Sequence, residues 1–170
     1  YGHGLAEVSR VFLDSGADWL AVNALYEASA LREAGITAPI YIMGYTMMED
    51  LARVWELEAR QVVYDQETID RLGELASHGQ FDKPIKLHIK VETGNNRQGI
   101  RIEDLVDFAK HILKAGDGKL EIEGIATHFA NIEDTTDHTY AFEQLEKFKK
   151  AQEMLKRAGI EVPMMHCANS

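Results

Sequence analysis

The sequence predicts an α/β domain with parallel strands, and three observations predict it. Short apolar runs rich in Val, Ile, Tyr and Leu alternate with amphipathic stretches of helical period over the whole length. No convincing hairpin signal joins one run to the next, so each connection contains a helix, as parallel strands require. The 170 residues, 45% of them hydrophobic and 27% charged, suit one globular domain with a buried core.

Six apolar runs, each bounded by Gly, Pro or Asp, are predicted to be strands. In chain order they cover residues 19–22, 40–43, 61–64, 85–91, 120–127 and 163–167. Apolar residues at three- and four-residue spacing predict a helix over 102–113, before the fifth run, and another over 141–158, before the sixth.

Short local patterns predict where several helices begin and end. Thr46 stands three residues before Glu49, which predicts a capping box at the start of a helix. Gly16, Gly35 and Gly159 each follow a helical stretch. They predict helix ends in the left-handed conformation that glycine adopts without strain.

Two architectures are compatible with this alternation, a doubly wound open sheet and a (β/α)8 barrel. No Gly-x-Gly-x-x-Gly follows a strand, which leaves the dinucleotide-binding open sheet little support. Six units make up about three quarters of a barrel of roughly 250 residues. We therefore predict a (β/α)8 TIM-type barrel that lacks its first and last strands, as part of a longer protein. Barrel enzymes carry their chemistry where strands end, and polar residues occur there at Asn23, Asp65, Glu92, Thr93, His128, His166, Asn169 and Ser170.

Charge and cysteine content exclude several classes of function. Eighteen Lys and Arg against 28 Asp and Glu give a net charge of −10, which argues against nucleic-acid partners and anionic membranes. No apolar run approaches the roughly 18 residues of a membrane span, and the first residues show no signal-peptide pattern. The single cysteine, Cys167, excludes an internal disulfide framework and favours a cytoplasmic location. No spacing resembles a tight metal site or a hydrolase nucleophile elbow.

The run 87–92 alternates strictly, with His88, Lys90 and Glu92 on one side. One interpretation is a strand with a solvated face. In a parallel barrel both faces are covered, and a buried ammonium then needs a partner or a lowered pKa. The loop that follows offers Arg97 between two glycines. These residues indicate a barrel enzyme that binds an anionic molecule.

The histidines and the last residues leave alternatives open. His128 ends a strand, where a structural role is more common than a catalytic one, and His166 is a candidate core residue. Asn169 and Ser170 could cap a helix or contribute to a phosphate site. Arg32 and Glu33 are interpreted as part of an ordinary solvated helix face, as are Glu56 and Glu58.

Taken in order, the motifs resemble those of the alanine racemase family, which uses pyridoxal 5′-phosphate (PLP) on a barrel. YGHG at 1–4 is similar to the end of the family's Lys-x-Asn-Ala-Tyr-Gly-His-Gly signature. KVETG at 90–94, followed by Arg97 and Gly99, is similar to its Lys-Val-Asp-Thr-Gly-Met-x-Arg-Leu-Gly segment. THFA at 127–130 and HCANS at 166–170 are similar to two further strand ends of the family. The resemblance covers essentially the whole chain.

This resemblance implies a role for each matched residue. Tyr1, and Ser170 with Asn169, would bind the phosphate of PLP from opposite sides. Arg97 would approach the phenolic oxygen of the cofactor. Lys90 matches a lysine that is often carbamylated in this family and would orient Arg97. His128 would lie under the cofactor ring, and Met43 would pack near the ring.

The resemblance also implies the reaction and the partners. It implies interconversion of L- and D-alanine to supply D-alanine for peptidoglycan, by a homodimeric parent enzyme. The PLP-binding lysine precedes Tyr1 in the family signature, and the second base lies in a C-terminal β-domain, so residues 1–170 alone are expected to be inactive. A broad-specificity amino-acid or serine racemase, a single-domain PLP-binding protein without activity, and a truncated barrel that binds nothing remain alternatives. Asn95 and Gln98 replace the family's usual Met and Leu, which affects the expected substrate range.

Overall fold

Six parallel strands form one curved sheet in the computed structural model, which describes residues 2–79, 82–130, 132 and 136–169. Along the sheet the order is β1-β2-β3-β4-β6-β7, so each strand lies beside the next one in the sequence, apart from the short β5. The strands are β1 (Leu20–Val22), β2 (Ile40–Ile42), β3 (Ala59–Val63), β4 (Ile85–Glu92), β6 (Leu120–His128) and β7 (Met164–Ala168). These match the six predicted runs to within two residues at each end.

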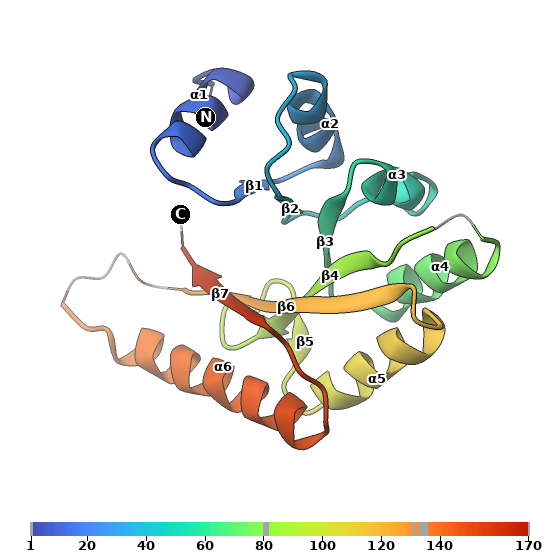
Figure 1. Ribbon diagram of the computed structural model, residues 1–170. Coiled ribbons are helices and arrows are strands. Elements are labelled where there is room, and N and C mark those ends of the chain that lie inside the picture. The colour runs from blue at the N-terminus through green and yellow to red at the C-terminus, as the bar shows by residue number, and fades with distance from the viewer. Residues whose placement is uncertain (1, 80–81, 131, 133–135, 170) are drawn as a thin grey trace.

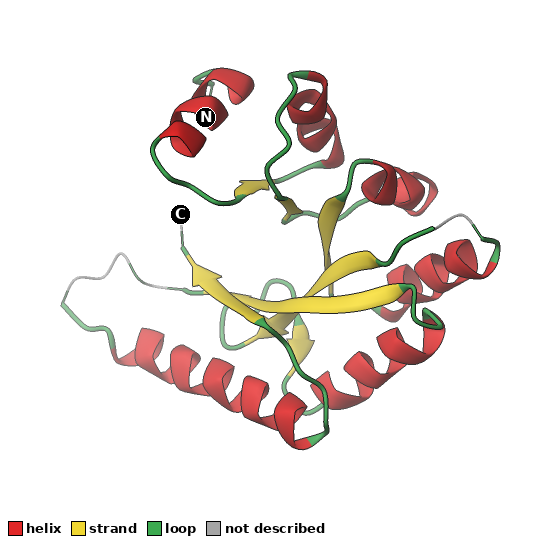
Figure 2. Cartoon of the chain, viewed as in Figure 1, coloured by secondary structure: helices red, strands yellow, loops and turns green. Residues whose placement is uncertain are grey.

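Helices connect the strands and cover the outer side of the sheet, as Figures 1 and 2 show. They are α1 (Leu5–Asp14), α2 (Leu25–Glu33), η1 (Met48–Asp50) with α3 (Leu51–Glu56), α4 (Gln66–Ser77), α5 (Leu105–Ala115) and α6 (Thr139–Arg157). The strands follow an arc whose ends are β1 and β7. This is the predicted α/β barrel over part of its circumference.

One strand was not predicted. β5 (Ile100–Arg101) pairs with Val91 and Glu92 of β4, beside the main path of the sheet. Two residues are too few for a periodic pattern, so the sequence gives no strand signal there. The pairing turns the loop after β4 back against the end of its own strand.

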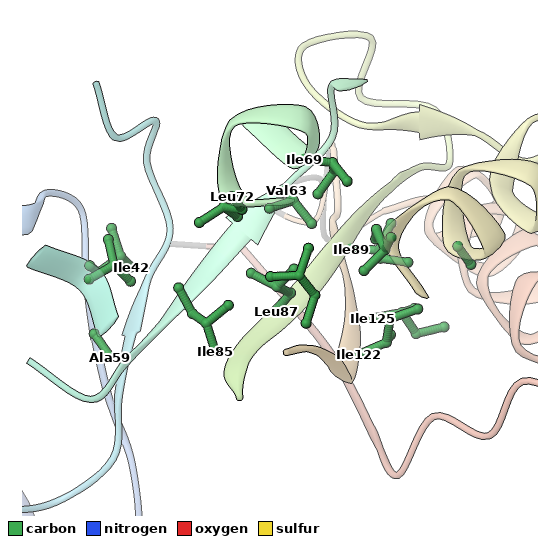
Figure 3. Close-up of a cluster of buried hydrophobic side chains, with 14 of the residues drawn as sticks. Ile42, Ala59, Val63, Ile69, Leu72, Ile85, Leu87, Ile89, Ile122 and Ile125 are labelled. Carbon is green, nitrogen blue, oxygen red and sulfur yellow. The ribbon is translucent and has the colours of Figure 1, made fainter. Parts of the chain in front are cut away.

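The main core lies between the sheet and the helices. In β4 the residues at alternate positions, from Ile85 to Val91, are at most 2% exposed and face this layer. Ile69 and Leu72 of α4 pack against them from outside (Figure 3). Because the apolar side chains of β4 face the helices, its polar side chains face the concave side of the sheet.

The predicted helix ends are confirmed, whereas the predicted capping box is wrong. Gly16, Gly35 and Gly159 have φ of 99°, 79° and 76°. Thr46 is buried, and its hydroxyl donates to Gln61 Oε1 at 2.7 Å instead of capping a helix. The helical segment after Thr46 begins with the 3-10 turn η1, which has no side-chain cap.

Arg32 differs from its predicted role as a solvated helix residue. Its guanidinium donates to three backbone carbonyl oxygens, Leu57 O at 2.8 Å, Ile36 O at 2.7 Å and Ala38 O at 2.8 Å. Burial lowers the pKa of Arg32, and the charge of Glu58 partly opposes this shift. The side chain joins the end of α2 to the end of α3. The spacing of apolar residues along the sequence could not predict these contacts of Arg32, because the acceptors are backbone atoms.

Candidate active site at the carboxyl end of the sheet

The polar residues of β4 lie on the concave side of the sheet. His88 is only 1% exposed and Lys90 is half-buried, so the middle of this face is not a solvated surface. The interpretation of β4 as a strand with one wet face is therefore wrong. His88 and Lys90 pair in register with Gly124 and Ala126 of β6, whose small side chains leave room for them.

A charged cluster occupies the concave side near the amino ends of the strands. The carboxylate of Glu123 accepts from Lys86 Nζ at 2.7 Å, Arg60 Nε at 3.0 Å and His88 Nε2 at 3.2 Å. Burial alone would raise the pKa of Glu123, but hydrogen bonds from Lys86, Arg60 and His88 outweigh it and lower the pKa to about 2. The ring of Trp19 lies 4.8 Å from the Arg60 guanidinium carbon.

The loop after β4 is shaped by the side chain of Glu92. Its carboxylate accepts from the backbone N–H of Gly94 at 2.5 Å and of Arg97 at 3.3 Å. At Gly99, φ is 142°, and an added Cβ would lie 2.6 Å from Glu92 N. A side chain there would push β5 off β4, so the tight turn predicted from the two flanking glycines is confirmed.

Lys90 and Arg97 bring two positive charges to the carboxyl end of β4. Burial lowers the pKa of Lys90, the charge of Arg97 lowers it further, and Glu92 partly opposes the shift. Within the described residues no hydrogen bond or ion pair reaches Lys90 Nζ. The exposed Arg97 side chain and the half-buried Lys90 therefore give this end of the sheet an electrostatic preference for an anion.

A second network fixes the ends of β4 and β6 together. Gln144 of α6 is fully buried and donates to Thr93 Oγ1 at 3.2 Å and to the carbonyl of His128 at 3.4 Å. Its side-chain oxygen accepts from Ala130 N at 2.9 Å. The hydroxyl groups of Thr93 and Thr127 form a hydrogen bond of 2.8 Å, and the Thr127 hydroxyl donates to the Val91 carbonyl at 2.9 Å.

Sequence reasoning missed the role of Gln144, although a signal existed. The residue lies on the apolar stripe of α6, three positions after Ala141 and four before Phe148, which are both buried. A polar side chain on such a stripe must have hydrogen-bond partners in the core. That pattern predicts a buried contact, but it cannot say with which strands.

The other predicted site residues lie at the same end of the sheet or outside the described residues. His128 is the last residue of β6 and pairs in register with Ala168, so Asn169 follows directly beside it. Met43 follows β2 and is 44% exposed. Tyr1 and Ser170 lie outside the described residues.

No helix within the described parts of the chain is long and apolar enough to cross a membrane.

The fold and site together define a class of protein, a parallel α/β barrel domain with basic side chains at the carboxyl ends of its strands. The family model "Alanine racemase, N-terminal domain" matches residues 1–170. The chain therefore belongs to the alanine racemase N-terminal domain family.

Three relatives illustrate the similarity. The chain is 39% identical over 170 residues to the alanine racemase of Desulfovibrio desulfuricans, covering 100% of this chain and 44% of that protein. A solved alanine racemase from Streptomyces lavendulae matches with a TM-score of 0.90 and 26% identity, over 100% of this chain and 44% of that one. A histidine racemase from Leuconostoc mesenteroides matches with a TM-score of 0.85 and 28% identity, over 98% of this chain and 43% of that one. The chain thus spans less than half the length of the curated relatives it matches.

Proposed function

We propose that residues 1–170 are the cofactor-binding barrel part of a PLP-dependent alanine racemase. The observation that supports this most is the match to the alanine racemase N-terminal domain over the whole chain, combined with Lys90 and Arg97 at the carboxyl end of β4. The full-length protein, in this proposal, is a homodimer with a C-terminal β-domain, and it supplies D-alanine for peptidoglycan.

The donors at this end of the sheet fit PLP, whose phosphate and phenolic oxygen are anionic. Lys90 is destabilised as an ammonium by burial and by Arg97, so Arg97 is the cation at this end that favours an anion. Arg97 would bind the phenolic oxygen. Asn169, with Ser170 and Tyr1, would bind the phosphate. Bound PLP supplies an electron sink that makes the proton on the α-carbon of an amino acid removable.

The chain's own residues would then orient and support this site. His128 would lie beneath the cofactor ring, held from behind because its carbonyl accepts from Gln144. Met43 would pack against the ring from β2. Glu92 fixes the backbone of the loop that carries Arg97, so the Arg97 side chain would start from a fixed point when the cofactor binds.

Two measurements on the full-length protein test this function. We expect the visible absorption of PLP bound to a lysine, and interconversion of L- and D-alanine measured by chiral chromatography. A correctly folded protein that fails to bind added PLP would contradict the cofactor assignment. A protein that binds PLP but leaves alanine unchanged would contradict the substrate assignment only.

Lys90 is proposed to carry a carbamate. Its neutral Nζ would attack carbon dioxide, forming an N–C bond as one C–O π bond opens and the nitrogen releases a proton to water, so that the buried amine becomes an anion beside Arg97. The lowered pKa of Lys90 favours the neutral amine that this step needs. Carbon-13 NMR in labelled bicarbonate should show one carbamate signal that Lys90→Ala removes and Lys110→Ala, a change on α5, retains. An unmodified lysine would contradict the proposal.

A different amino-acid substrate is the second candidate. The match to a histidine racemase favours it, because racemases for different side chains share this barrel. Asn95 and Gln98, on the loop after β4, stand where the family pattern has apolar residues. Racemisation rates over a panel that includes alanine, serine and histidine would decide between a specific and a broad enzyme.

A further inference from the structure

The concave side of the sheet carries a continuous line of hydrogen bonds that runs across three strands. It begins at Glu123 of β6, whose Oε2 lies 3.2 Å from His88 Nε2 on β4. It continues from His88 Nδ1 to His166 Nε2 on β7, 2.8 Å away. Glu123 and His88 are 7% and 1% exposed, so the contact between them is shielded from bulk water, whereas His166 is half-buried.

The chemistry of the acceptor at one end determines where each proton must lie. Glu123 is ionised and can only accept, since hydrogen bonds from Lys86, Arg60 and His88 outweigh burial and lower its pKa to about 2. His88 Nε2 therefore carries a proton. Burial lowers the pKa of His88, and the charges of Arg60 and Lys86 lower it further against the effect of Glu123. His88 is thus neutral, and its Nδ1 is an acceptor.

The same reasoning applies to the next ring. His88 Nδ1 accepts, so His166 Nε2 must donate to it. Burial, followed by the charges of His88 and Lys90, lowers the pKa of His166 to about 4. His166 is consequently neutral near pH 7, and its second nitrogen, Nδ1, holds a lone pair.

We propose that Glu123 is a positioning residue that fixes His88 and His166 in their Nε2–H tautomers, so that His166 presents Nδ1 only as a hydrogen-bond acceptor on the concave side of the sheet. His166 pairs in register with Ala126, which pairs with Lys90 on its other side. The acceptor therefore lies at the level of Lys90 and favours a donor there. This consequence for the cofactor end rests on the proposed function, whereas the tautomers themselves do not.

The ring of Tyr41 helps to fix the orientation of both imidazoles. Tyr41 packs against both imidazoles, with its ring centroid 4.9 Å from that of His88 and 4.9 Å from that of His166. The Tyr41 hydroxyl has no hydrogen bond within the described residues. A Cβ on Gly124 would lie 2.6 Å from His88 Nδ1, so glycine there keeps the path to His166 open.

The test is nitrogen-15 NMR of the full-length protein labelled at histidine, with His88→Asn and His166→Asn used to assign the two rings. Two-bond couplings from the carbon-bound ring protons identify which nitrogen carries hydrogen. We expect a single Nε2–H pattern for both rings at pH 7. An Nδ1–H pattern at either ring, or a doubly protonated His88, would overturn the proposal.

Three variants test whether Glu123 sets this pattern. Glu123→Ala removes the acceptor, and both rings should lose their single tautomer. Gly124→Ala places a Cβ 2.6 Å from His88 Nδ1 and 2.8 Å from its Cε1, so the His88 ring must shift and His166 should lose its single tautomer. Glu121→Ala, a change at the exposed acid two residues earlier on β6, should alter neither. Folding of each variant is checked by circular dichroism.

Retention of both tautomers in folded Glu123→Ala would show that Glu123 is merely structural. These readouts need neither PLP nor turnover. A protein with the expected tautomers that does not bind PLP would therefore overturn the proposed function and leave this inference standing. A protein that binds PLP and racemises alanine but lacks the expected tautomers would overturn this inference and leave the proposed function standing.

Discussion

Arg97 illustrates how one exposed side chain can matter for function and little for stability. Its backbone N–H donates to the carboxylate of Glu92, while its side chain is exposed on the loop. Loss of the guanidinium therefore leaves the loop backbone in place. Exposed substitutions of this kind usually change the free energy of unfolding by less than about 0.5 kcal/mol.

We expect Arg97→Ala to lower kcat/KM of the full-length enzyme about 10- to 100-fold, the loss that corresponds to one charged hydrogen bond of about 1.5–3 kcal/mol. Steady-state racemisation and thermal unfolding measure the two effects separately. Arg101→Ala is the matched control, since Arg101 is 75% exposed and its side chain pairs with Asp104. Turnover close to wild type in Arg97→Ala would remove Arg97 from the site.

Tyr41 is a residue whose polar atom opposes burial. Its side chain is 7% exposed, its hydroxyl lacks a partner among the described residues, and burial raises its pKa. An unsatisfied buried hydroxyl costs about 1–3 kcal/mol.

Tyr41→Phe should therefore raise the free energy of unfolding by about 1 kcal/mol, measured by urea denaturation of the full-length protein. Tyr26→Phe, a change at a residue that is 74% exposed, should leave it unchanged. A decrease on Tyr41→Phe would mean that the hydroxyl has a partner outside the described residues.

At the scale of elements, the ends of helices are joined by side chains as well as by packing. Glu27 of α2 accepts from the backbone N–H groups of Asn23 at 2.8 Å and Ala24 at 2.9 Å, which fixes the turn between β1 and α2. Arg32 then holds the other end of the same helix through three carbonyls. Both contacts compensate groups that a helix end leaves without partners.

Arg32→Met keeps the length of the side chain and removes its donors. We expect a loss of about 2–4 kcal/mol in the free energy of unfolding, because three carbonyls lose a charged donor at once. Arg53→Met serves as the control, since Arg53 donates to Ser29 Oγ at 3.5 Å on an exposed surface. Equal stability of the two variants would contradict the role assigned to Arg32.

At the scale of the whole molecule, the buried charged cluster makes stability depend on pH. The pKa of Glu123 is about 2 against an ordinary 4.5, and the pKa of His166 is about 4 against 6.5. For both groups the unfolded chain binds protons at a higher pH than the folded one. The free energy of unfolding therefore falls on acidification, first through His166 between pH 6.5 and 4, then through Glu123 between pH 4.5 and 2.

Urea denaturation at a series of pH values should show this decrease, with up to about 3 kcal/mol from Glu123 alone. Glu123→Gln cannot ionise, so its stability should be lower at pH 7 and should decline less below pH 4.5. Glu121→Gln should follow the wild-type curve. A wild-type stability that does not change between pH 7 and 4 would contradict the lowered pKa of His166, and one that does not change between pH 4.5 and 2 would contradict the lowered pKa of Glu123.

Much of the fold was predictable because it depends on local periodicity. The six strands and the glycine helix ends follow from patterns that each segment carries by itself. Prediction failed where partners were distant in sequence. Thr46 was assigned to a local cap because Glu49 is three residues away, whereas its actual partner is Gln61, buried on β3.

Residue order by itself determined the alternation of strands and helices, the parallel sheet that follows from it, and the motifs shared with the alanine racemase family. Only the tertiary structure decided which polar side chains meet, because Glu123, His88 and His166 lie on three strands separated by 35 and 78 residues along the chain. Those contacts, and the proton positions they require, arise from the register between strands, and no single segment carries that information.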